Sequence, residues 1–578
     1  MEKKIEKHPI YKLNTEEVDF SNFRVLLVYA NSPMDNLFPV GLSSIGGMLK
    51  KHKIDYEIFD TTYYPNDGRL GVNKSHTKSR DANLIDRLQV AEFDYNLVGV
   101  KYIETNVFDD FRKKVLDYKP SVIMLSTVEP THKFGIEMLN AVRDLKVPTF
   151  VGGCFAIFAP EKCIKDEAVD YMCVGEGEYA NIEFCKALAQ GKDTTNLKGV
   201  WAKDGDKIIR NPKGPLVEMS DLPMLDFNKY DPKRIYRPMS GKLWKMVPIE
   251  FSRGCPYKCT FCSAPVFEEQ FKDVGTWSRS KPIDLIEREM KYYINELGVE
   301  YFYFVSETFL AMPKKRFYDF CKMYERIGLP FWFNTRPETI REEKVKMLEN
   351  INCHRMSIGI ESGNQDYARK MLKRMATDQQ IIDACKIVSA SSIELSVNNV
   401  VGFPDETREM MFDTIKLNRQ FEANSHSCAI FQPYHGTTLH SYCVKKGYFD
   451  KDELAEDLTY ASPLKQKHIT HPEIQGIAKC FALYTKLPEN LYDFIKIAEK
   501  DDARGNKMFT ELMMLYKGVY APRAESDVGG GTRILIDQNR LNKHKNEKDN
   551  TNAIDRLRQI QHELTNKIHF KIFFVIVL

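Results

Sequence analysis

Three cysteines lie within eight residues in the segment RGCPYKCTFC, residues 253–262. They are Cys255, Cys259 and Cys262, and their spacing is C-x-x-x-C-x-x-C. Thiolates are the ligands that iron–sulfur clusters use. Three protein ligands leave one iron with an open position, whereas a structural zinc ion needs a fourth protein ligand. Because no Cys or His follows within the next thirty residues, the spacing favours an iron–sulfur cluster over zinc.

A strand followed by a short loop must position these thiols. The cysteines come directly after a strand candidate at 247–251, the first in an α/β run that covers about 246–435. Further strand candidates are 301–305, 331–334, 356–360, 395–401 and 427–432, and helical patterns such as 282–297 and 314–327 separate them. Six βα units predict a partial or full parallel barrel, whose active site lies at the carboxyl ends of its strands.

A second α/β run precedes this one, at about 22–230. Its strand candidates are 23–30, 56–60, 122–126, 149–153 and 171–174, with helices expected at 41–50 and 134–145. The alternation predicts a parallel sheet covered on both faces, with a ligand beyond the carboxyl ends of the strands. Small residues gather at those ends, which lets a ligand approach the backbone closely. The alternative, that these glycines only form turns, remains open.

The cysteine segment, with Phe261 before the last cysteine, resembles the cluster motif of the radical S-adenosylmethionine (SAM) enzymes. The resemblance covers about 246–440. It implies that the three thiolates hold a 4Fe-4S cluster and that the open iron chelates SAM. One electron then cleaves SAM to methionine and a 5′-deoxyadenosyl radical. The resemblance implies that SAM contacts Phe261, Glu307, Asn334, Arg336, Glu361, Ser362, Val401 and Gly402.

These positions fall in segments that resemble known motifs of the family. The segment 306–309 resembles the acidic motif that meets the SAM amino group, although Ser306 stands where an acid is usual, so Glu307 bears that role alone. The segments 359–363 and 400–407 resemble the ribose-binding motif and the segment whose backbone meets adenine.

The N-terminal half resembles the cobalamin-binding domain that precedes the barrel in one subgroup. The implied cobalamin-binding residues are Pro39, Gly41, Ser126, Thr127, Gly152, Gly153, Gly175, Glu176, Gly177 and Glu178. The D-x-H-x-x-G element that supplies a lower axial histidine is absent after the first strand, and Phe155 stands where many relatives carry a histidine. We interpret His132 as an ordinary loop histidine. Cobalamin is therefore expected without a histidine lower ligand, and an empty, vestigial domain is the alternative.

Both resemblances together imply methylation of an unactivated carbon. One SAM would charge cob(I)alamin to methylcobalamin, and a second would yield the radical that abstracts hydrogen from the substrate. A cobalamin-dependent cyclisation or rearrangement is the enzymatic alternative. A non-catalytic iron–sulfur or cobalamin sensor is the alternative from another class. The substrate is expected to be a small molecule or a peptide, and the electron donor a flavodoxin or ferredoxin.

Tyr434 and His435 follow the last barrel strand, with His440 beyond them. They are candidates to line the substrate entrance, and a polar turn with a packed aromatic ring is an equally good interpretation.

The composition is that of a globular protein and favours reduced thiols in a cytosol. The 578 residues include thirteen cysteines, and Lys+Arg 83 against Asp+Glu 80 leaves a net charge of +3, which favours no DNA partner. The polar N-terminus has no signal-peptide pattern, and no run reaches the length of a membrane span. We expect the other ten cysteines to be packed thiols in an oxygen-guarded cytoplasm. The predicted parts are an extension (1–21), a cobalamin domain with linker (22–230), a barrel (231–437), a helical domain (438–522) and a flexible tail (523–578).

Overall fold

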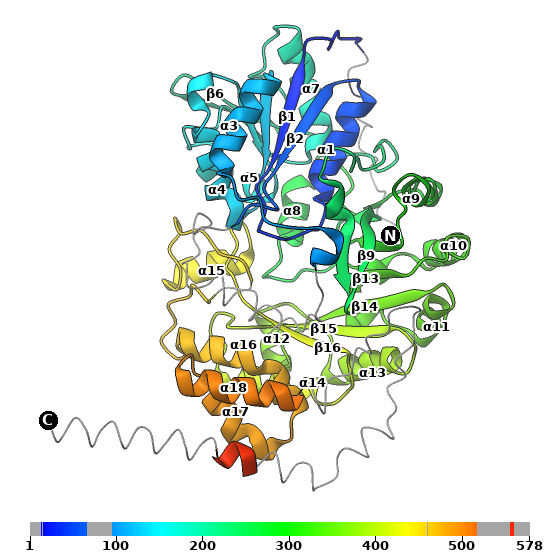
Figure 1. The fold of residues 1–578 in the computed structure, drawn as a ribbon, viewed down its shortest axis with the longest axis vertical. Coiled ribbons are helices and arrows are strands. Elements are labelled where there is room, and N and C mark those ends of the chain that lie inside the picture. The colour runs from blue at the N-terminus through cyan, green and yellow to red at the C-terminus, as the bar shows by residue number, and fades with distance from the viewer. Residues whose placement is uncertain (1–12, 14–15, 66–94, 459–460, 517–554, 560–578) are drawn as a thin grey trace, which may run out of the picture. The chain divides into compact units, whose positions relative to one another are not determined.

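The structure is a computed structural model that describes residues 13, 16–65, 95–458, 461–516 and 555–559 (Figure 1). The chain forms two compact units. The described part of the first unit comprises 13, 16–65, 95–334 and 433–457, and that of the second 335–432, 458, 461–516 and 555–559. Most of the predicted tail and extension lies outside the described residues, and the five domain boundaries stay predictions.

The N-terminal part of the first unit is a seven-stranded sheet in the order β2-β1-β3-β4-β5-β6-β7. Strands β1 to β5 run parallel, and β6 and β7 continue the sheet as antiparallel strands. The order 2-1-3-4-5 is that of flavodoxin-like folds, whose ligands bind where the strand order reverses, between β1 and β3. The strands are β1 (Arg24–Tyr29), β2 (Asp55–Asp60), β3 (Val122–Ser126), β4 (Thr149–Gly152), β5 (Tyr171–Cys173), β6 (Val200–Asp204) and β7 (Lys207–Arg210).

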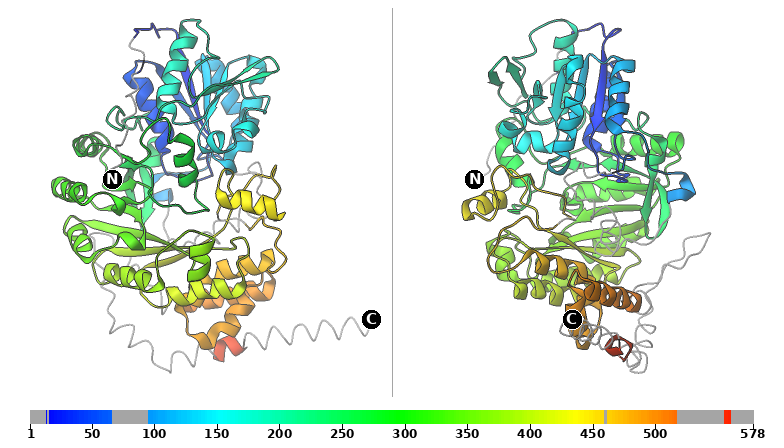
Figure 2. Two further views of the ribbon diagram at one scale, coloured as in Figure 1. Left: turned by 180° about the vertical axis from the view of Figure 1, so that it is seen from behind. Right: turned by 60° about the vertical axis from the view of Figure 1, so that its left-hand side comes forward.

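Helices cover both faces of this sheet (Figure 2). Leu26, Val28, Ile123 and Leu125 alternate with their neighbours along β1 and β3 and pack with apolar residues of the helices on one face, which gives a core with strand periodicity. The helices are α1 (Val40–Lys51), α3 (Val107–Tyr118), α4 (Glu129–Asn140), α5 (Cys154–Phe158), α6 (Pro160–Cys163) and α7 (Gly177–Ala189), and α1 packs on α7.

Helix α4 differs from the helix predicted at 134–145, because it begins at Glu129. Pro130 occupies the first turn, where a backbone N–H would have no intrahelical partner, so the proline costs the helix no hydrogen bond. The backbone N–H of Thr131 donates to the carbonyl of Val128. His132 therefore lies in a helix, and its interpretation as a loop histidine is wrong.

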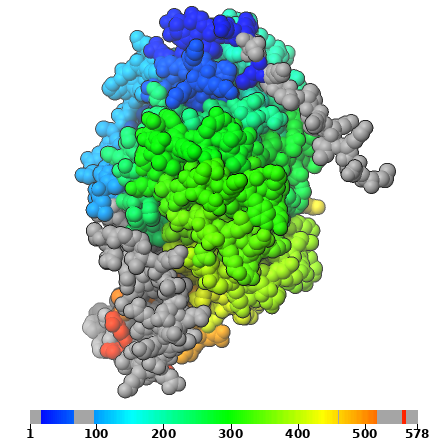
Figure 3. Space-filling model, turned by 90° about the vertical axis from the view of Figure 1, so that its right-hand side faces the viewer, coloured from blue at the N-terminus to red at the C-terminus, as the bar shows by residue number. Residues whose placement is uncertain are grey.

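The first half of the barrel also belongs to the first unit. Strands β8 (Tyr236–Met239), β9 (Lys242–Glu250), β12 (Tyr301–Val305) and β13 (Phe331–Thr335) lie side by side, and β9, β12 and β13 run parallel. Short strands β10 (Ser252–Arg253) and β11 (Arg279–Ser280) form a separate antiparallel pair. The helices are α8 (Ala264–Phe271), α9 (Ile283–Leu297), α10 (Lys314–Tyr324) and α15 (Thr438–Lys446). Side chains of α9 and α10 belong to the green surface that faces the viewer in Figure 3.

The second unit carries three parallel strands, β14 (Cys353–Glu361), β15 (Glu394–Val401) and β16 (Ser425–Ile430). Helices α11 (Glu342–Asn350), α12 (Gln365–Lys370), α13 (Asp378–Ser389) and α14 (Arg408–Asn418) accompany them. Helices α16 (His471–Lys486), α17 (Tyr492–Ala498) and α18 (Ala503–Leu515) pack with β15 and β16 in one apolar core.

The sequence predicts an α/β protein with a Rossmann-like (flavodoxin-like) parallel sheet domain, then a (βα)6 partial TIM barrel, then a C-terminal helical domain. The structure confirms this fold class. Each predicted barrel strand is present, with ends that move by a few residues. Within the described residues, no helix is both long enough and apolar enough to span a membrane.

Candidate active site

The loop that carries the three cysteines begins at a glycine that no other residue can replace without strain. Gly254 has φ of +100°, and a Cβ added to it would lie 2.5 Å from the carbonyl oxygen of Trp277. The indole N–H of Trp277 in turn donates to the carbonyl of Cys255, at 3.4 Å. Strand β10 and this close approach fix the start of the loop, and α8 begins directly after its end.

The three thiols lie in one partly buried group. Cys255 and Cys259 are buried and Cys262 is half-buried. The backbone N–H of Ala264 donates to Sγ of Cys262 at 3.5 Å, and Sγ of Cys255 lies 3.5 Å from the hydroxyl of Thr308. Burial raises the pKa of Cys262 to about 11 and raises that of Cys255, and the charges of neighbouring cysteines act in the same direction. Iron must therefore displace protons as it binds, which makes metal binding pH-dependent.

Among the described residues, no three His, Cys, Asp or Glu side chains form a group that could hold a metal ion. An iron–sulfur cluster needs thiolates on different irons, so its ligands stand farther apart than those of one ion. Three neighbouring thiols on a short loop, with an amide N–H directed at one sulfur, fit such a cluster.

Two predicted SAM residues lie at the ends of neighbouring strands in the first unit, and one of them contacts the cysteine loop. Glu307 follows β12, and its Oε1 accepts a hydrogen bond from the N–H of Gly254 at 3.1 Å. Burial raises the pKa of the Glu307 carboxyl. Asn334 ends β13 and donates to the hydroxyl of Tyr303 at 3.4 Å. Ser306, which stands where an acid is usual, lies 2.7 Å from the hydroxyl of Ser252. Phe261 is half-buried in the loop itself.

In the second unit, the end of β14 is strained. Glu361 has φ of +70°, an uncommon conformation for a residue with a side chain, and a register shift interrupts the β14–β15 ladder there. Burial raises the pKa of the Glu361 carboxyl, while the positive charges of Arg374 and Arg336 oppose the rise. The hydroxyl of Ser362 is buried and has no hydrogen-bond partner among the described residues. Strain and an unpaired hydroxyl at a strand end are typical of ligand sites.

The next strand ends in a turn that a buried carboxyl holds. Val401 is fully buried at the end of β15, and Gly402 has φ of +78°. The N–H groups of Gly402 and Phe403 both donate to Oε2 of Glu406, at 2.8 and 3.1 Å. Burial raises the pKa of Glu406 to about 8. The segment expected to meet adenine is thus shaped by a carboxyl that the sequence analysis did not single out.

Several predicted cobalamin residues lie at the carboxyl edge of the N-terminal sheet. Ser126 and Gly152 end the neighbouring strands β3 and β4, and the N–H of Thr127 donates to the carbonyl of Gly152. Gly153 has φ of +98°, and a Cβ added there would lie 2.3 Å from the carbonyl oxygen of Thr127. Pro39 and Gly41 stand at the start of α1, where a Cβ on Gly41 would meet open space. Residues without a bulky side chain thus leave the backbone accessible at this edge, which lets a ligand approach it closely.

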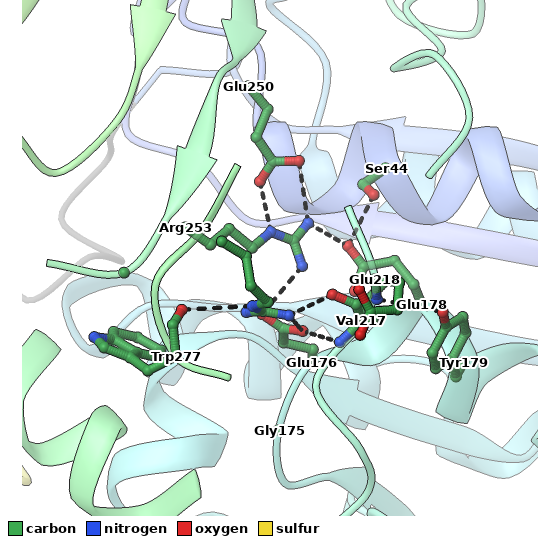
Figure 4. Close-up of polar contacts among 12 residues, drawn as sticks. Ser44, Gly175, Glu176, Glu178, Tyr179, Val217, Glu218, Glu250, Arg253 and Trp277 are labelled. Carbon is green, nitrogen blue, oxygen red and sulfur yellow. Dashed lines mark hydrogen bonds and ion pairs between the residues drawn. The ribbon is translucent and has the colours of Figure 1, made fainter. Parts of the chain in front are cut away.

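The turn from Gly175 to Glu178 is different, because its carboxylates are already paired (Figure 4). Glu176 forms ion pairs with Arg279 at 2.6 Å and Arg253 at 3.3 Å, and Glu178 accepts from Arg253 at 2.5 Å. Gly175 has φ of +145° and Gly177 begins α7. Both carboxylates of this turn are therefore engaged with arginines of the protein, and the assignment of the turn to cobalamin stays a prediction.

The candidate substrate residues Tyr434 and His435 are both engaged. The Tyr434 hydroxyl donates to the carbonyl of Glu456 at 2.9 Å, and Nδ1 of His435 lies 2.6 Å from Oε1 of Glu129. His132 packs against Phe155, with ring centroids 4.3 Å apart, and burial lowers its pKa to about 4. Their role at a substrate entrance stays a prediction.

Sequence reasoning missed Arg253, Thr308 and Glu406, each of which holds a predicted site segment in place. Arg253 and Glu406 lie inside the quoted motifs, and Arg253 directly precedes a motif glycine, which was the available signal for that residue. Glu178 as a partner of Arg253 and Cys255 as the partner of Thr308 are distant in sequence and could not be read from it. Glu406, in contrast, accepts from backbone groups only three and four residues before it.

Comparisons with known proteins agree with this geometry. Residues 249–417 match the family model described as the radical SAM superfamily, and residues 82–184 match the B12 binding domain. An uncharacterized methyltransferase of Pyrococcus horikoshii is 26% identical over 65% of this chain and 81% of that protein. The anaerobic magnesium-protoporphyrin IX monomethyl ester cyclase of Rubrivivax gelatinosus is 25% identical over 56% of this chain and 59% of that protein. The fold resembles that of the cobalamin-dependent SAM radical enzyme OxsB with aqua-cobalamin and SAM bound, with a TM-score of 0.59, 14% identity and coverage of 95% and 81%.

Proposed function

We propose that the chain is a cobalamin-dependent radical SAM enzyme, and specifically a methyltransferase that acts on an unactivated carbon. The observation that carries the proposal is the order of the two domains, a B12 binding domain followed by a radical SAM domain. The P. horikoshii relative, which is named a methyltransferase and is aligned over 81% of its length, supports methyl transfer in particular.

Different residues of the chain would hold the two cofactors. Cys255, Cys259 and Cys262 would hold the 4Fe-4S cluster, and the strand ends around Thr127 and Gly153 would face cobalamin. When these groups are bound, the cluster and SAM supply the chemistry that removes a hydrogen atom from the substrate, and cobalamin supplies a methyl group.

The protein side chains would position and shield the bound SAM, and they would not react themselves. Glu307, held by the N–H of Gly254, would accept hydrogen bonds from the SAM amino group. The unpaired hydroxyl of Ser362 and the carboxyl of Glu361 would bind the ribose hydroxyls. The backbone between Val401 and Phe403, fixed by Glu406, would contact adenine. The remaining predicted contacts, Phe261, Asn334 and Arg336, are part of this proposal.

A cobalamin-dependent cyclisation is the second candidate, because the R. gelatinosus relative is named a cyclase. A cyclase would use SAM only to remove hydrogen, whereas a methyltransferase also uses SAM as the source of the methyl group. The two products of SAM, 5′-deoxyadenosine and S-adenosylhomocysteine, therefore distinguish a methyltransferase from a cyclase. The two relatives are named a methyltransferase and a cyclase, which favours an enzyme over the sensor alternative.

The test uses protein purified without oxygen, loaded with iron, sulfide and hydroxocobalamin, and given SAM labelled in its methyl group, a reductant and an extract of small molecules and peptides. Methyl transfer predicts both 5′-deoxyadenosine and S-adenosylhomocysteine, with label in a new product. 5′-Deoxyadenosine alone would contradict methyl transfer and favour the cyclase. The variant Cys259→Ala is the control and should form neither 5′-deoxyadenosine nor a labelled product.

Radical SAM enzymes need a reductant. We propose that a flavodoxin or ferredoxin provides it, and that the protein works in a cytoplasm with little oxygen, because a cluster with an open iron is destroyed by oxygen.

A further inference from the structure

Two arginines and three glutamates form a buried network next to the cysteine loop (Figure 4). Arg253 donates through Nε to Oε1 of Glu250 at 2.7 Å and through Nη2 to Oε2 at 3.1 Å, and it also donates to Glu178. Arg279 contacts both oxygens of Glu176, at 3.0 and 2.6 Å. The side chains of the three glutamates are no more than 8% exposed. Charge-assisted, two-pronged pairs of this kind have defined geometry as well as strength.

The network compensates an unfavourable pairing of two cations. Arg253 and Arg279 lie directly opposite each other in the β10–β11 ladder. Like charges at opposite ladder positions destabilise a sheet. Oε1 of Glu176 lies between them, 3.3 Å from Arg253 and 2.6 Å from Arg279. The ladder at the base of the cysteine loop therefore depends on a carboxylate from the N-terminal domain.

The contacts continue from both sides of the network. On one side, Ser44 of α1 donates to Glu178 at 2.8 Å, which secures the start of α7. On the other side, Arg253 is followed at once by Gly254, whose tight fit against Trp277 fixes the path to Cys255. An unbroken chain of contacts thus joins the turn expected beside cobalamin to the loop expected to hold the cluster.

We infer that Arg253 is a positioning residue that sets the separation of the two cofactors by fixing the cysteine loop to the Glu176–Glu178 turn. This inference rests on the proposed function, because it assumes that both cofactors bind. It assigns Glu176 and Glu178 to the connection between the two sites, and leaves contact with the corrin to the backbone of the turn.

The variants separate this role from general stability. Arg253→Gln removes the cation, and Arg253→Lys keeps the charge but loses the two-pronged geometry. The matched control is Lys281→Met, which breaks another buried ion pair of the same unit, between Lys281 and Glu289 at 2.8 Å, without touching the Glu176–Glu178 turn. Glu178→Gln tests the connection from the other side and replaces Arg253→Gln if that variant does not fold.

The first measurement is the distance distribution between the reduced cluster and cob(II)alamin, two paramagnetic centres, by pulsed electron paramagnetic resonance. The wild-type protein and Lys281→Met should give the same narrow distribution. Arg253→Gln should broaden it about twofold or more, and Arg253→Lys should lie between, because a single ammonium replaces part of the network. An unchanged width in Arg253→Gln, or equal broadening in Lys281→Met, would overturn the inference.

The second measurement needs no cofactor. Amide hydrogen exchange in 176–179 and 254–262 should become about tenfold faster in Arg253→Gln and remain at the wild-type rate in Lys281→Met. Exchange at wild-type rates in both segments would also overturn the inference. If the wild-type protein binds no cobalamin, the proposed function fails, and exchange still decides whether Arg253 joins the two segments.

Discussion

At the scale of single residues, buried acids define the turns at the candidate site. Glu406 is fully buried, and its Oε2 accepts two backbone N–H groups, whereas its Oε1 has no partner among the described residues. Burial outweighs these two hydrogen bonds and raises the pKa of the carboxyl to about 8. The turn that follows β15 is consequently held by an acid that keeps its proton at neutral pH.

The elevated pKa predicts how the stability of this turn changes with pH. The folded carboxyl holds its proton up to about pH 8, whereas the unfolded one loses it near pH 4.5. The free energy of opening should therefore decrease as the pH rises between these values and level off above about 8, with a slope of up to about 1.4 kcal/mol per pH unit. Hydrogen exchange of the Gly402 and Phe403 amides, corrected for intrinsic exchange rates, measures this free energy of opening.

The neutral variant Glu406→Gln is the control for this effect. It should remove the pH dependence, because its side chain does not ionise. A wild-type protein whose opening free energy is constant from pH 5 to 8 would contradict the assigned protonation state.

At the scale of elements, one carboxylate connects α4 to the segment 433–457. Oε1 of Glu129 accepts from Nδ1 of His435 and from the N–H of Ala455, at 2.6 and 2.7 Å, and Oε2 accepts from the N–H of His435 at 2.9 Å. Glu129 and His435 are both buried. A segment more than 300 residues away along the chain is thereby held against the start of a helix at the edge of the N-terminal sheet.

Replacing Glu129 by leucine should release this segment. Two backbone donors and an imidazole would lose their acceptor, at a cost of about 1–3 kcal/mol for each buried group left unpaired. Amide exchange within 433–457 should therefore accelerate in Glu129→Leu. Glu137→Leu, a change on the same helix, is the control and should leave exchange there at the wild-type rate. Slow exchange in both variants would show that apolar packing, and not Glu129, holds the segment.

At the scale of the whole molecule, the apolar core of the N-terminal domain is independent of the cysteine loop. The core that packs on β1, β3 and β4 draws its buried residues from 26–174, and Cys255, Cys259 and Cys262 are not among them. The domain should therefore keep its shape when the cluster is absent.

Removal of iron tests this independence. After treatment with a chelator and an oxidant, the protein should lose its iron but bind hydroxocobalamin with unchanged stoichiometry and affinity. Absorbance of the bound corrin and iron analysis measure the two results separately. Loss of cobalamin binding together with iron would mean that the cluster, and not the sheet edge, organises the cobalamin site.

The sequence alone determined the local parts of this protein. The cysteine spacing predicts the cluster loop, and hydrophobic runs of strand length identified the barrel strands, because both signals lie within a few consecutive residues. Strand ends were displaced by a few residues, and α4 began earlier than expected, because capping contacts decide where an element ends.

Only the tertiary structure decided how these parts are held together. Glu176 and Glu178 were assigned to cobalamin from a local motif, yet their carboxylates pair with arginines that lie 75 to 103 residues farther along the chain. Likewise, no local pattern marks Glu129 as the partner of His435. Such pairs depend on which segments folding brings together. They also depend on burial, because a buried charge without a partner is energetically costly. The sequence therefore names the reactive groups, and the fold decides which residues hold them in place.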